Sequence, residues 1–366
     1  MSRIFKSIGL MSGTSMDGID LALIESDGEQ HIRILGTDYL EYSNETRAKI
    51  SKLISEKINI GEIKELENEL TLLHAQLVNS FLVKNKLLPS DIDLIGFHGQ
   101  TIYHNPQNSI TWQIGNSQLL ALKTNIKTIG DFRVRDVLEG GEGAPLVPIY
   151  HYYLFSNIAK PTLIMNVGGV SNVTYFDQSL DNLLAFDLCF GNAPSNDLMV
   201  QKFNMPYDKD GELASKGIVN PELLKQVIEA EIFNRKIPRS YSRNDFDEFL
   251  KIFSHLSPPD ILANYAQIIA EILYKTVYNQ LPSKPQQILL CGGGAKNKHL
   301  LKIIQNKFHD IKIATTQDYG FNVDSIEAEA FAFLAIRRIL NLPISFSNTS
   351  GTKNPKGSIG GIIFEK

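Results

Sequence analysis

Apolar residues recur along the chain with both the helical and the strand period, and this alternation predicts a mixed α/β protein. A short apolar run from Ile4 to Ile8 predicts a first strand, and the alternation of Ile19, Leu21 and Leu23 predicts a second. The segment between them is rich in Gly, Ser and Thr. This glycine-rich loop therefore joins two strands, rather than a strand and a helix.

The same periods predict the other elements. Helices are expected at about 44–56, 63–81 (ending before Pro89), 221–234, 257–278, 299–308 and 324–340. Further strands are expected at 93–97, 109–113, 127–129, 183–186 and 287–291. Residues 207–217 are polar and predict a loop or lid.

The first loop has the residue types of a phosphate site. Gly13 and Gly18 allow the backbone to approach a ligand closely or to adopt a positive φ, and Thr14 and Ser15 add hydroxyl donors. Successive N–H groups in such a loop can surround an anion. An ordinary hairpin turn is the alternative interpretation. The chain has no G-x-x-x-x-G-K-[ST] motif, so the loop is not a Walker loop.

The pattern of strand, glycine loop and strand occurs again at residues 161–175, around Gly168 and Gly169. A chain of 366 residues usually forms more than one core. We therefore expect two related domains, 1–158 and 159–366, each with a phosphate loop. A third glycine turn, Gly292-Gly293-Gly294, lies between a predicted strand and a helix, which suits a nucleotide but does not match G-x-G-x-x-G.

Asp187 is the main candidate for proton chemistry. It follows an apolar strand and precedes Gly191 and Asn192, so the sequence places a carboxylate at a sheet edge beside a flexible turn. A general base could occupy such a position. A structural Asx turn is the alternative.

Three further positions could bind a substrate. Arg133, between Asp131 and Asp136, could clamp a carboxylate or phosphate, or form a surface ion pair. His98 at a strand end could contact a ligand or be structural. Glu327 in the first turn of a helix could be functional or only favour the helix dipole.

Composition narrows the function classes. Apolar residues make up 43% of the chain and charged residues 21%, which is ordinary for a globular enzyme. The net charge of −4 gives no basic footprint for nucleic acid, and no apolar run is long enough to cross a membrane. Two cysteines, Cys189 and Cys291, give neither a disulfide framework nor zinc spacing. With no secretory segment at the N-terminus, we expect a cytoplasmic protein.

The segment from Gly9 to Gly18, GLMSGTSMDG, resembles the signature of the anhydro-N-acetylmuramic acid kinases, which belong to the actin/hexokinase/Hsp70-like ATPase superfamily. Other blocks resemble the same family in the same order, and the resemblance covers most of the chain. They lie at 96–101, 113–116, 130–133, 143–148, 166–172, 207–211, 291–297 and 327–332.

The resemblance implies two RNase H-like domains, of the actin-like ATPase type, facing each other across a cleft for nucleotide and sugar. It implies an ATP-dependent kinase that opens 1,6-anhydro-N-acetylmuramic acid with water and phosphorylates O6 in cell-wall recycling. Asp187 would be the base, with ATP and Mg²⁺ as cofactors, metal ligands not assigned and a homodimer expected. ATP-binding residues would be Gly13, Thr14, Ser15, Met16, Asp17, Gly18, Ile19, Asp20, Gly168, Gly169, Gly292, Gly293, Gly294 and Asn297. Substrate-binding residues would be His98, Gln100, Arg133, Asp187 and Glu327.

One block departs from the family pattern. Where the family commonly has Phe-Asp-Thr-Gly-Pro-Gly-Asn, this chain has Leu188, Cys189 and Phe190 between Asp187 and Gly191. We expect this change to alter the polarity and size of the site wall. A silent nucleotide-dependent sugar binder, or a kinase of a related amino sugar, is therefore the alternative function. The role of residues 238–243, which match the family only loosely, is left open.

Overall fold

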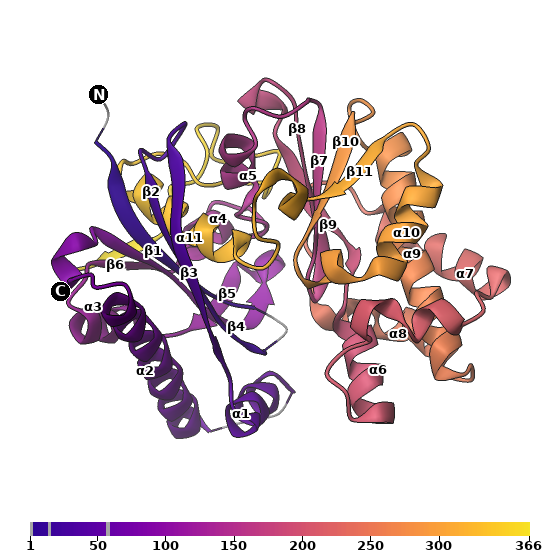
Figure 1. The fold of residues 1–366 in the computed structure, drawn as a ribbon, viewed down its shortest axis with the longest axis horizontal. Helices are drawn as coiled ribbons and strands as arrows, with labels where there is room; N and C mark the ends of the chain where they lie inside the picture. The colour runs from indigo at the N-terminus through magenta and orange to yellow at the C-terminus, as the bar shows by residue number, and fades with distance from the viewer. Residues whose placement is uncertain (1–2, 14–15, 56–58) are drawn as a thin grey trace. The chain divides into compact units, whose positions relative to one another are not determined.

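The structure is a computed structural model, and it describes residues 3–13, 16–55 and 59–366 (Figure 1). The chain divides into two compact units, Met1–Ser156 with Ser325–Lys366, and Asn157–Asp324. The first division lies close to the predicted boundary at residue 158. The sequence prediction differs from the structure at the C-terminus, because Ser325–Lys366 packs with the first unit.

The first unit contains a seven-stranded sheet of order β12-β6-β4-β1-β2-β3, with β5 paired to β4. β1, β2 and β3 are antiparallel neighbours, whereas β4 and β6 continue the sheet in parallel with β1. The strands are β1 (Phe5–Ser12), β2 (Gly18–Ser26), β3 (Ile32–Glu41), β4 (Leu94–Asn105), β5 (Ile110–Ile114), β6 (Thr128–Gly130) and β12 (Ile362–Phe364).

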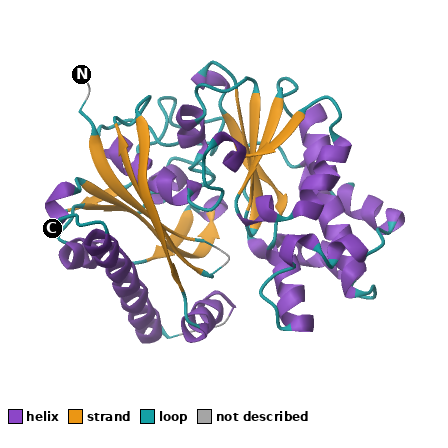
Figure 2. Cartoon of the chain, in the orientation of Figure 1, coloured by secondary structure: helices purple, strands orange, loops and turns teal. Residues whose placement is uncertain are grey.

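The second unit contains a five-stranded sheet of order β11-β10-β7-β8-β9 (Figure 2). β7, β8 and β9 are antiparallel, and β10 and β11 continue in parallel with β7. The strands are β7 (Thr162–Val167), β8 (Val170–Phe176), β9 (Leu184–Phe190), β10 (Gln287–Cys291) and β11 (Lys312–Thr315). Both sheets therefore have a three-strand meander followed by two parallel strands, which confirms the α/β class and the repeat predicted from the two glycine hairpins.

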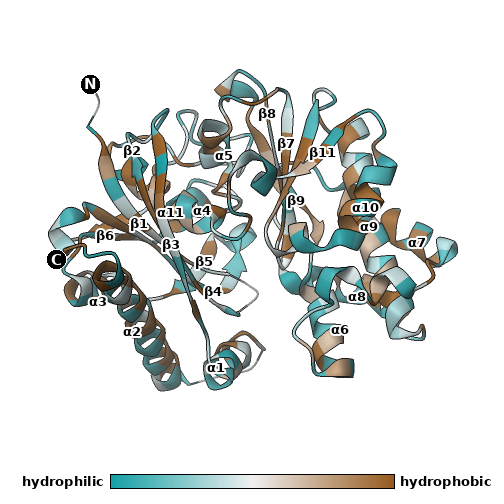
Figure 3. Cartoon of the chain, viewed as in Figure 1, coloured by the Kyte–Doolittle hydropathy of each residue, from teal (hydrophilic) through white to brown (hydrophobic). Residues whose placement is uncertain are grey.

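The helices of the first unit are α1 (Asn44–Ser55), α2 (Ile60–Lys84), α3 (Ser117–Thr124), α4 (Val134–Leu138), α5 (Pro148–Leu154) and α11 (Ile326–Ile339). The predicted apolar stripe of α2 is buried at Leu66, Leu70 and Phe81. Figure 3 shows hydrophobic and hydrophilic residues along this helix, as an amphipathic helix requires.

The helices of the second unit are α6 (Ala193–Phe203), α7 (Pro221–Ile228), α8 (Asp247–Leu250), α9 (Pro258–Asn279) and α10 (Lys298–Lys307). The prediction for α9 is confirmed: Ser257 caps it and Pro258 occupies its first turn. The predicted helix 221–234 is too long, because α7 ends at Ile228 and a separate short 3₁₀ helix follows at Glu231–Asn234.

Helix α11 contacts β1, β2 and β4 within the first unit. It lies on a pair of glycines, Gly9 of β1 and Gly96 of β4, which are neighbours in the parallel ladder. A Cβ atom on Gly9 would be 1.8 Å from the carbonyl oxygen of Ala328, and one on Gly96 would be 2.1 Å from that of Phe331. Only glycine allows the helix backbone to lie this close to the strands. In the described part of the chain, no helix is long and apolar enough to span a membrane.

This contact predicts a large cost for a side chain at the glycine pair. Gly96→Val should lower the free energy of unfolding by about 1–3 kcal/mol or more, since overpacked cores lose this much and the clash here is with backbone atoms that cannot move aside. Urea denaturation measures this difference. The control is Gly61→Ala in the exposed first turn of α2, where alanine is the better helix former. An unfolding free energy unchanged by Gly96→Val would contradict the close approach of α11.

Candidate active site

Buried side chains support the start of the first glycine loop through hydrogen bonds. The Ser12 hydroxyl donates to Gln100 Oε1 at 2.5 Å and lies 2.9 Å from the Tyr42 hydroxyl. Gln100 Nε2 donates to the Gly13 carbonyl at 3.2 Å. Because only 1% of the Gln100 side chain is exposed, its amide supports the loop rather than facing solvent. Thr14 and Ser15, predicted as phosphate donors, lie outside the described residues.

The remaining loop residues have different roles. Met16 has a φ of 55° and donates its N–H to the Gly13 carbonyl, whereas the Asp17 carbonyl accepts from the N–H of Tyr42 at 2.9 Å. Ile19 is fully buried, so its side chain belongs to the core. Asp20 is half-buried on β2.

Gly18 was predicted to allow close approach of a ligand, but the structure gives it another role. A Cβ atom there would be 2.4 Å from the carbonyl oxygen of Leu40 and 2.5 Å from the hydroxyl of Tyr39. Both neighbours are on β3. Glycine at this position therefore allows β2 to pack against β3.

His98 and Arg133 are in direct contact within the first unit. Arg133 Nε donates to His98 Nε2 at 3.0 Å, and the other ring nitrogen of His98 lies 2.8 Å from the Gly99 carbonyl. Burial, and secondarily the Arg133 charge, hold the pKa of His98 well below its usual value, so the ring is neutral and accepts this hydrogen bond. Arg133 Nη1 also donates to the Gly143 carbonyl at 2.7 Å. His98 thus orients the arginine predicted to bind the sugar.

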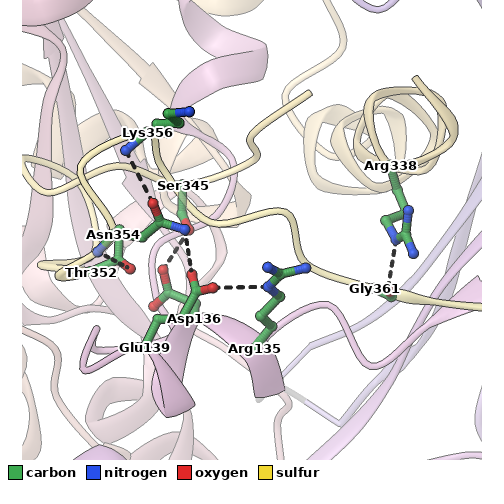
Figure 4. A network of polar contacts seen from close by, with 9 residues as sticks. All are labelled: Arg135, Asp136, Glu139, Arg338, Ser345, Thr352, Asn354, Lys356 and Gly361. Atoms are coloured by element: carbon green, nitrogen blue, oxygen red, sulfur yellow. Dashed lines mark hydrogen bonds and ion pairs between the residues drawn. The ribbon is translucent and has the colours of Figure 1, made fainter. Parts of the chain in front are cut away.

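The sequence grouped Asp136 with Arg133, but the structure gives Asp136 a separate role. Its carboxylate is fully buried and accepts from the Gly143 N–H at 2.7 Å and from the hydroxyls of Ser345 and Ser350. Figure 4 shows this carboxylate beside Glu139 and the C-terminal residues that approach it. Asp136 therefore fixes the 140–145 loop, whose Gly143 carbonyl meets Arg133, to the C-terminal segment.

Three other acidic positions differ in their surroundings. Glu327, the predicted substrate residue, is half-buried in the first turn of α11. Glu329, which the sequence analysis did not select, is fully buried and accepts from the hydroxyls of Tyr150 at 2.7 Å and Ser325 at 2.6 Å. Burial raises the pKa of Glu329, while these two hydrogen bonds oppose that effect. Asp131 has a φ of 55°, and burial followed by the Glu67 charge raises its pKa.

In the second unit, the Gly168-Gly169 turn is joined to the start of α6. The N–H of Asn192 donates to the Gly168 carbonyl at 2.7 Å, and that of Gly191 donates to the Gly169 carbonyl at 2.9 Å. Asn192 also donates from its side chain to the Val167 carbonyl at 3.0 Å. The predicted hairpin therefore forms one compact turn structure with Gly191 and Asn192.

The third glycine turn lies against β7. Gly292 has a φ of 73°, and a Cβ atom there would be 2.3 Å from Asn166 Oδ1. A Cβ atom on Gly294 would be 2.3 Å from Val167 Cγ1, whereas one on Gly293 would make only an ordinary contact. Asn297 caps α10 by accepting from the N–H of Leu300 at 2.9 Å. Packing alone thus requires Gly292 and Gly294.

Asp187 lies inside β9, not at its end as predicted, because the strand continues to Phe190. The pairing of β9 with β8 shifts by one residue here: Asp187 pairs with Asn172, whereas Cys189 pairs with Ser171. The carboxylate of Asp187 accepts the N–H of Tyr241 at its Oδ2 atom, at 2.8 Å. Its side chain is buried, with 7% exposed.

The expected change of the site wall is wrong for the residues after Asp187. Leu188 and Cys189 are fully buried, and Phe190 is 1% exposed. All three belong to the hydrophobic core of the second unit, where the Phe190 ring packs edge-on against Phe246 and Tyr265. The departure from the family pattern therefore changes the core behind the site.

The sequence profile of the anhydro-N-acetylmuramic acid kinase family matches residues 5–365. The chain belongs to this family. The anhydro-N-acetylmuramic acid kinase of Zymomonas mobilis is 37% identical over 358 residues, covering 95% of this chain and 97% of its own. The anhydro-N-acetylmuramic acid kinase of Haemophilus influenzae is 35% identical over 374 residues, covering 97% of each.

Two solved structures are also similar to this kinase-family chain. Component A of the Acidaminococcus fermentans (R)-2-hydroxyglutaryl-CoA dehydratase aligns with a TM-score of 0.48 at 12% identity, covering 92% of this chain and 99% of its own. A ROK family glucokinase of Streptomyces griseus, in complex with glucose and AMPPNP, aligns with a TM-score of 0.42 at 10% identity, covering 90% and 99%.

The support of the first loop by Gln100 gives a testable prediction. Gln100→Leu removes two buried hydrogen bonds, one to the Gly13 carbonyl and one from the Ser12 hydroxyl, so it should weaken ATP binding by roughly 10–100-fold. Sugar affinity should change much less. Calorimetric titration with each ligand measures both. The control is Gln287→Leu, another buried glutamine whose amide donates to the Ala159 carbonyl and Thr162 hydroxyl. Loss of sugar affinity alone would place Gln100 in the sugar site instead.

Proposed function

We propose that this chain uses ATP to convert 1,6-anhydro-N-acetylmuramic acid to N-acetylmuramic acid 6-phosphate in the cytoplasm. Membership of the kinase family supports the proposed class of reaction. The position of Asp187 supports the proposed mechanism, because a buried carboxylate oriented by a main-chain N–H is suited to accept a proton at a defined position.

The proposed reaction has two linked steps. Asp187 takes a proton from a water molecule as the water oxygen bonds to C1 of the sugar, and the C1–O6 bond breaks. The freed O6 then attacks the γ-phosphorus of ATP in line, and the bond to the leaving ADP oxygen breaks. Holding sugar, water and ATP in the right geometry supplies much of the rate acceleration.

The glycine turns are the proposed nucleotide contacts. Backbone N–H groups of the β1–β2 loop, the Gly168-Gly169 turn and the Gly292–Gly294 turn would bind the phosphates. Mg²⁺ accompanying ATP would offset phosphate charge; this ion usually keeps several waters and takes only one or two protein carboxylates. Asp17 and Asp20, next to the first loop, are oxygen donors of the right kind. Within the described residues, no group of three His, Cys, Asp or Glu side chains is placed to hold a metal ion. The expected homodimer stays a prediction.

The alternative of a silent sugar binder rested on the altered residues after Asp187. Since Leu188, Cys189 and Phe190 point into the core, that observation no longer favours it. Kinase activity on the anhydro sugar is therefore the function we propose.

Asp187→Asn tests the base directly. Asparagine keeps the shape and can accept the Tyr241 N–H but cannot take the proton, so kcat should fall by roughly 10²–10⁴. A base that acts only in the transition state contributes little to ground-state binding, so sugar and ATP affinities should stay within a few-fold. Coupled measurement of ADP release gives kcat. A folded variant with a near wild-type kcat would exclude Asp187 as the base.

Arg133→Ala tests the proposed clamp on the anionic part of the sugar. Loss of a charge-assisted hydrogen bond, about 1.5–3 kcal/mol, should raise the KM for sugar roughly 10–100-fold, while ATP binding without sugar changes little. Arg135→Ala is the matched control, because Arg135 is an exposed neighbour on α4 paired with Glu139. Equal losses of sugar and ATP affinity in Arg133→Ala would remove the residue from the sugar site.

A further inference from the structure

We infer that Arg239 is a positioning residue for Asp187: it holds the 239–241 segment against the open edge of β9, so that the N–H of Tyr241 fixes the carboxylate. This inference rests on the proposed role of Asp187 as the base. The 239–241 segment lies in the part of the sequence whose role was left open.

The contacts between Arg239 and Asp187 are reciprocal. The N–H of Asp187 donates to the Arg239 carbonyl at 2.9 Å, and Arg239 Nε donates to the Asp187 carbonyl at 3.1 Å. Among the described residues β9 is the last strand of its sheet, so these main-chain groups at its outer edge bond to Arg239 instead of to another strand. Together with the Tyr241 N–H on Oδ2, the 239–241 segment thus makes three hydrogen bonds to Asp187.

Arg239 is anchored on its other side as well. Its Nη1 atom donates to the Arg235 carbonyl at 2.7 Å, and its Nη2 atom lies 3.5 Å from Gln280 Oε1 at the end of α9. The guanidinium lies over the ring of Phe186, at 5.1 Å from the ring centre. Only 1% of this side chain is exposed. A buried guanidinium with such a set of acceptors has one defined position, because its planar fork fixes the directions of its donors.

This arrangement determines where the base points. A donor on Oδ2 fixes the plane of the Asp187 carboxylate, and so the direction in which its other oxygen lies. Small displacements of a reacting group can reduce the rate greatly, although they leave ground-state binding nearly unchanged. Arg239 should therefore act on kcat rather than on substrate affinity.

The test compares Arg239→Met with a second buried arginine. Arg337 is 2% exposed and also donates to main-chain oxygens, those of Pro343 and Gly28, but it belongs to the other unit. Both substitutions remove a buried guanidinium, so both should reduce stability. Only Arg239→Met should lower kcat, by roughly 10–100-fold, with the KM values for sugar and ATP within a few-fold. Arg239→Lys should not restore kcat fully, because lysine lacks the fork.

A double substitution separates this inference from the proposed function. If Arg239 acts through Asp187, Arg239→Met should lower kcat no further in the Asp187→Asn background. An equal loss in both backgrounds, an equal fall of kcat in Arg337→Met, or an unchanged kcat in Arg239→Met would overturn the inference while Asp187 remains the base. A fully active Asp187→Asn variant would instead overturn the proposed function. Variants are compared at a temperature where circular dichroism shows all of them folded.

Discussion

The contact of α11 with the paired glycines Gly9 and Gly96 is the constraint on which the first unit depends. It brings residues 325–366 back to the sheet that begins the chain, so that the two ends of the sequence share one core. The same return brings Ser345 and Ser350 to the Asp136 carboxylate. Asp136 in turn fixes the loop whose Gly143 carbonyl meets Arg133. Packing of the C-terminal segment thus determines the position of a residue proposed to bind the sugar.

Most secondary-structure elements could be predicted from the sequence, because their apolar periods are regular and their ends carry caps or prolines. The hairpins around residues 13 and 168 also indicated the repeat that both sheets share. The assignment of α11 to the first unit was not predicted, because an apolar period indicates that a helix is buried but does not show on which sheet it packs. One signal was Gly96 inside the predicted strand 93–97, because a strand interior disfavours glycine unless a backbone approaches closely. Gly9 gave no such signal, because the predicted first strand ended at Ile8 and the observed β1 continues to Ser12.

The candidate site was only partly predictable. Local sequence selected Asp187, His98 and Arg133, and the family resemblance added Gln100. Only the fold shows that Gln100 supports the first loop and that His98 orients Arg133. The burial of Phe190 was missed because its ring packs against Phe246 and Tyr265, which are distant in the sequence. Arg239 was missed because it lies in an irregular segment without a periodic pattern, and its Nε and carbonyl bind main-chain groups of Asp187, which is distant in the sequence.

The proposed enzyme opens the anhydro ring with water and then phosphorylates the freed oxygen. Turnover in ¹⁸O-labelled water tests this sequence of steps, with unlabelled product kept in the same water as the control for exchange. We expect one labelled oxygen in the sugar 6-phosphate, at C1, none in the phosphoryl group, and one ADP for each product molecule. A labelled phosphoryl group, ADP formed without sugar product, or a product whose sugar carries no solvent oxygen would contradict this sequence of steps.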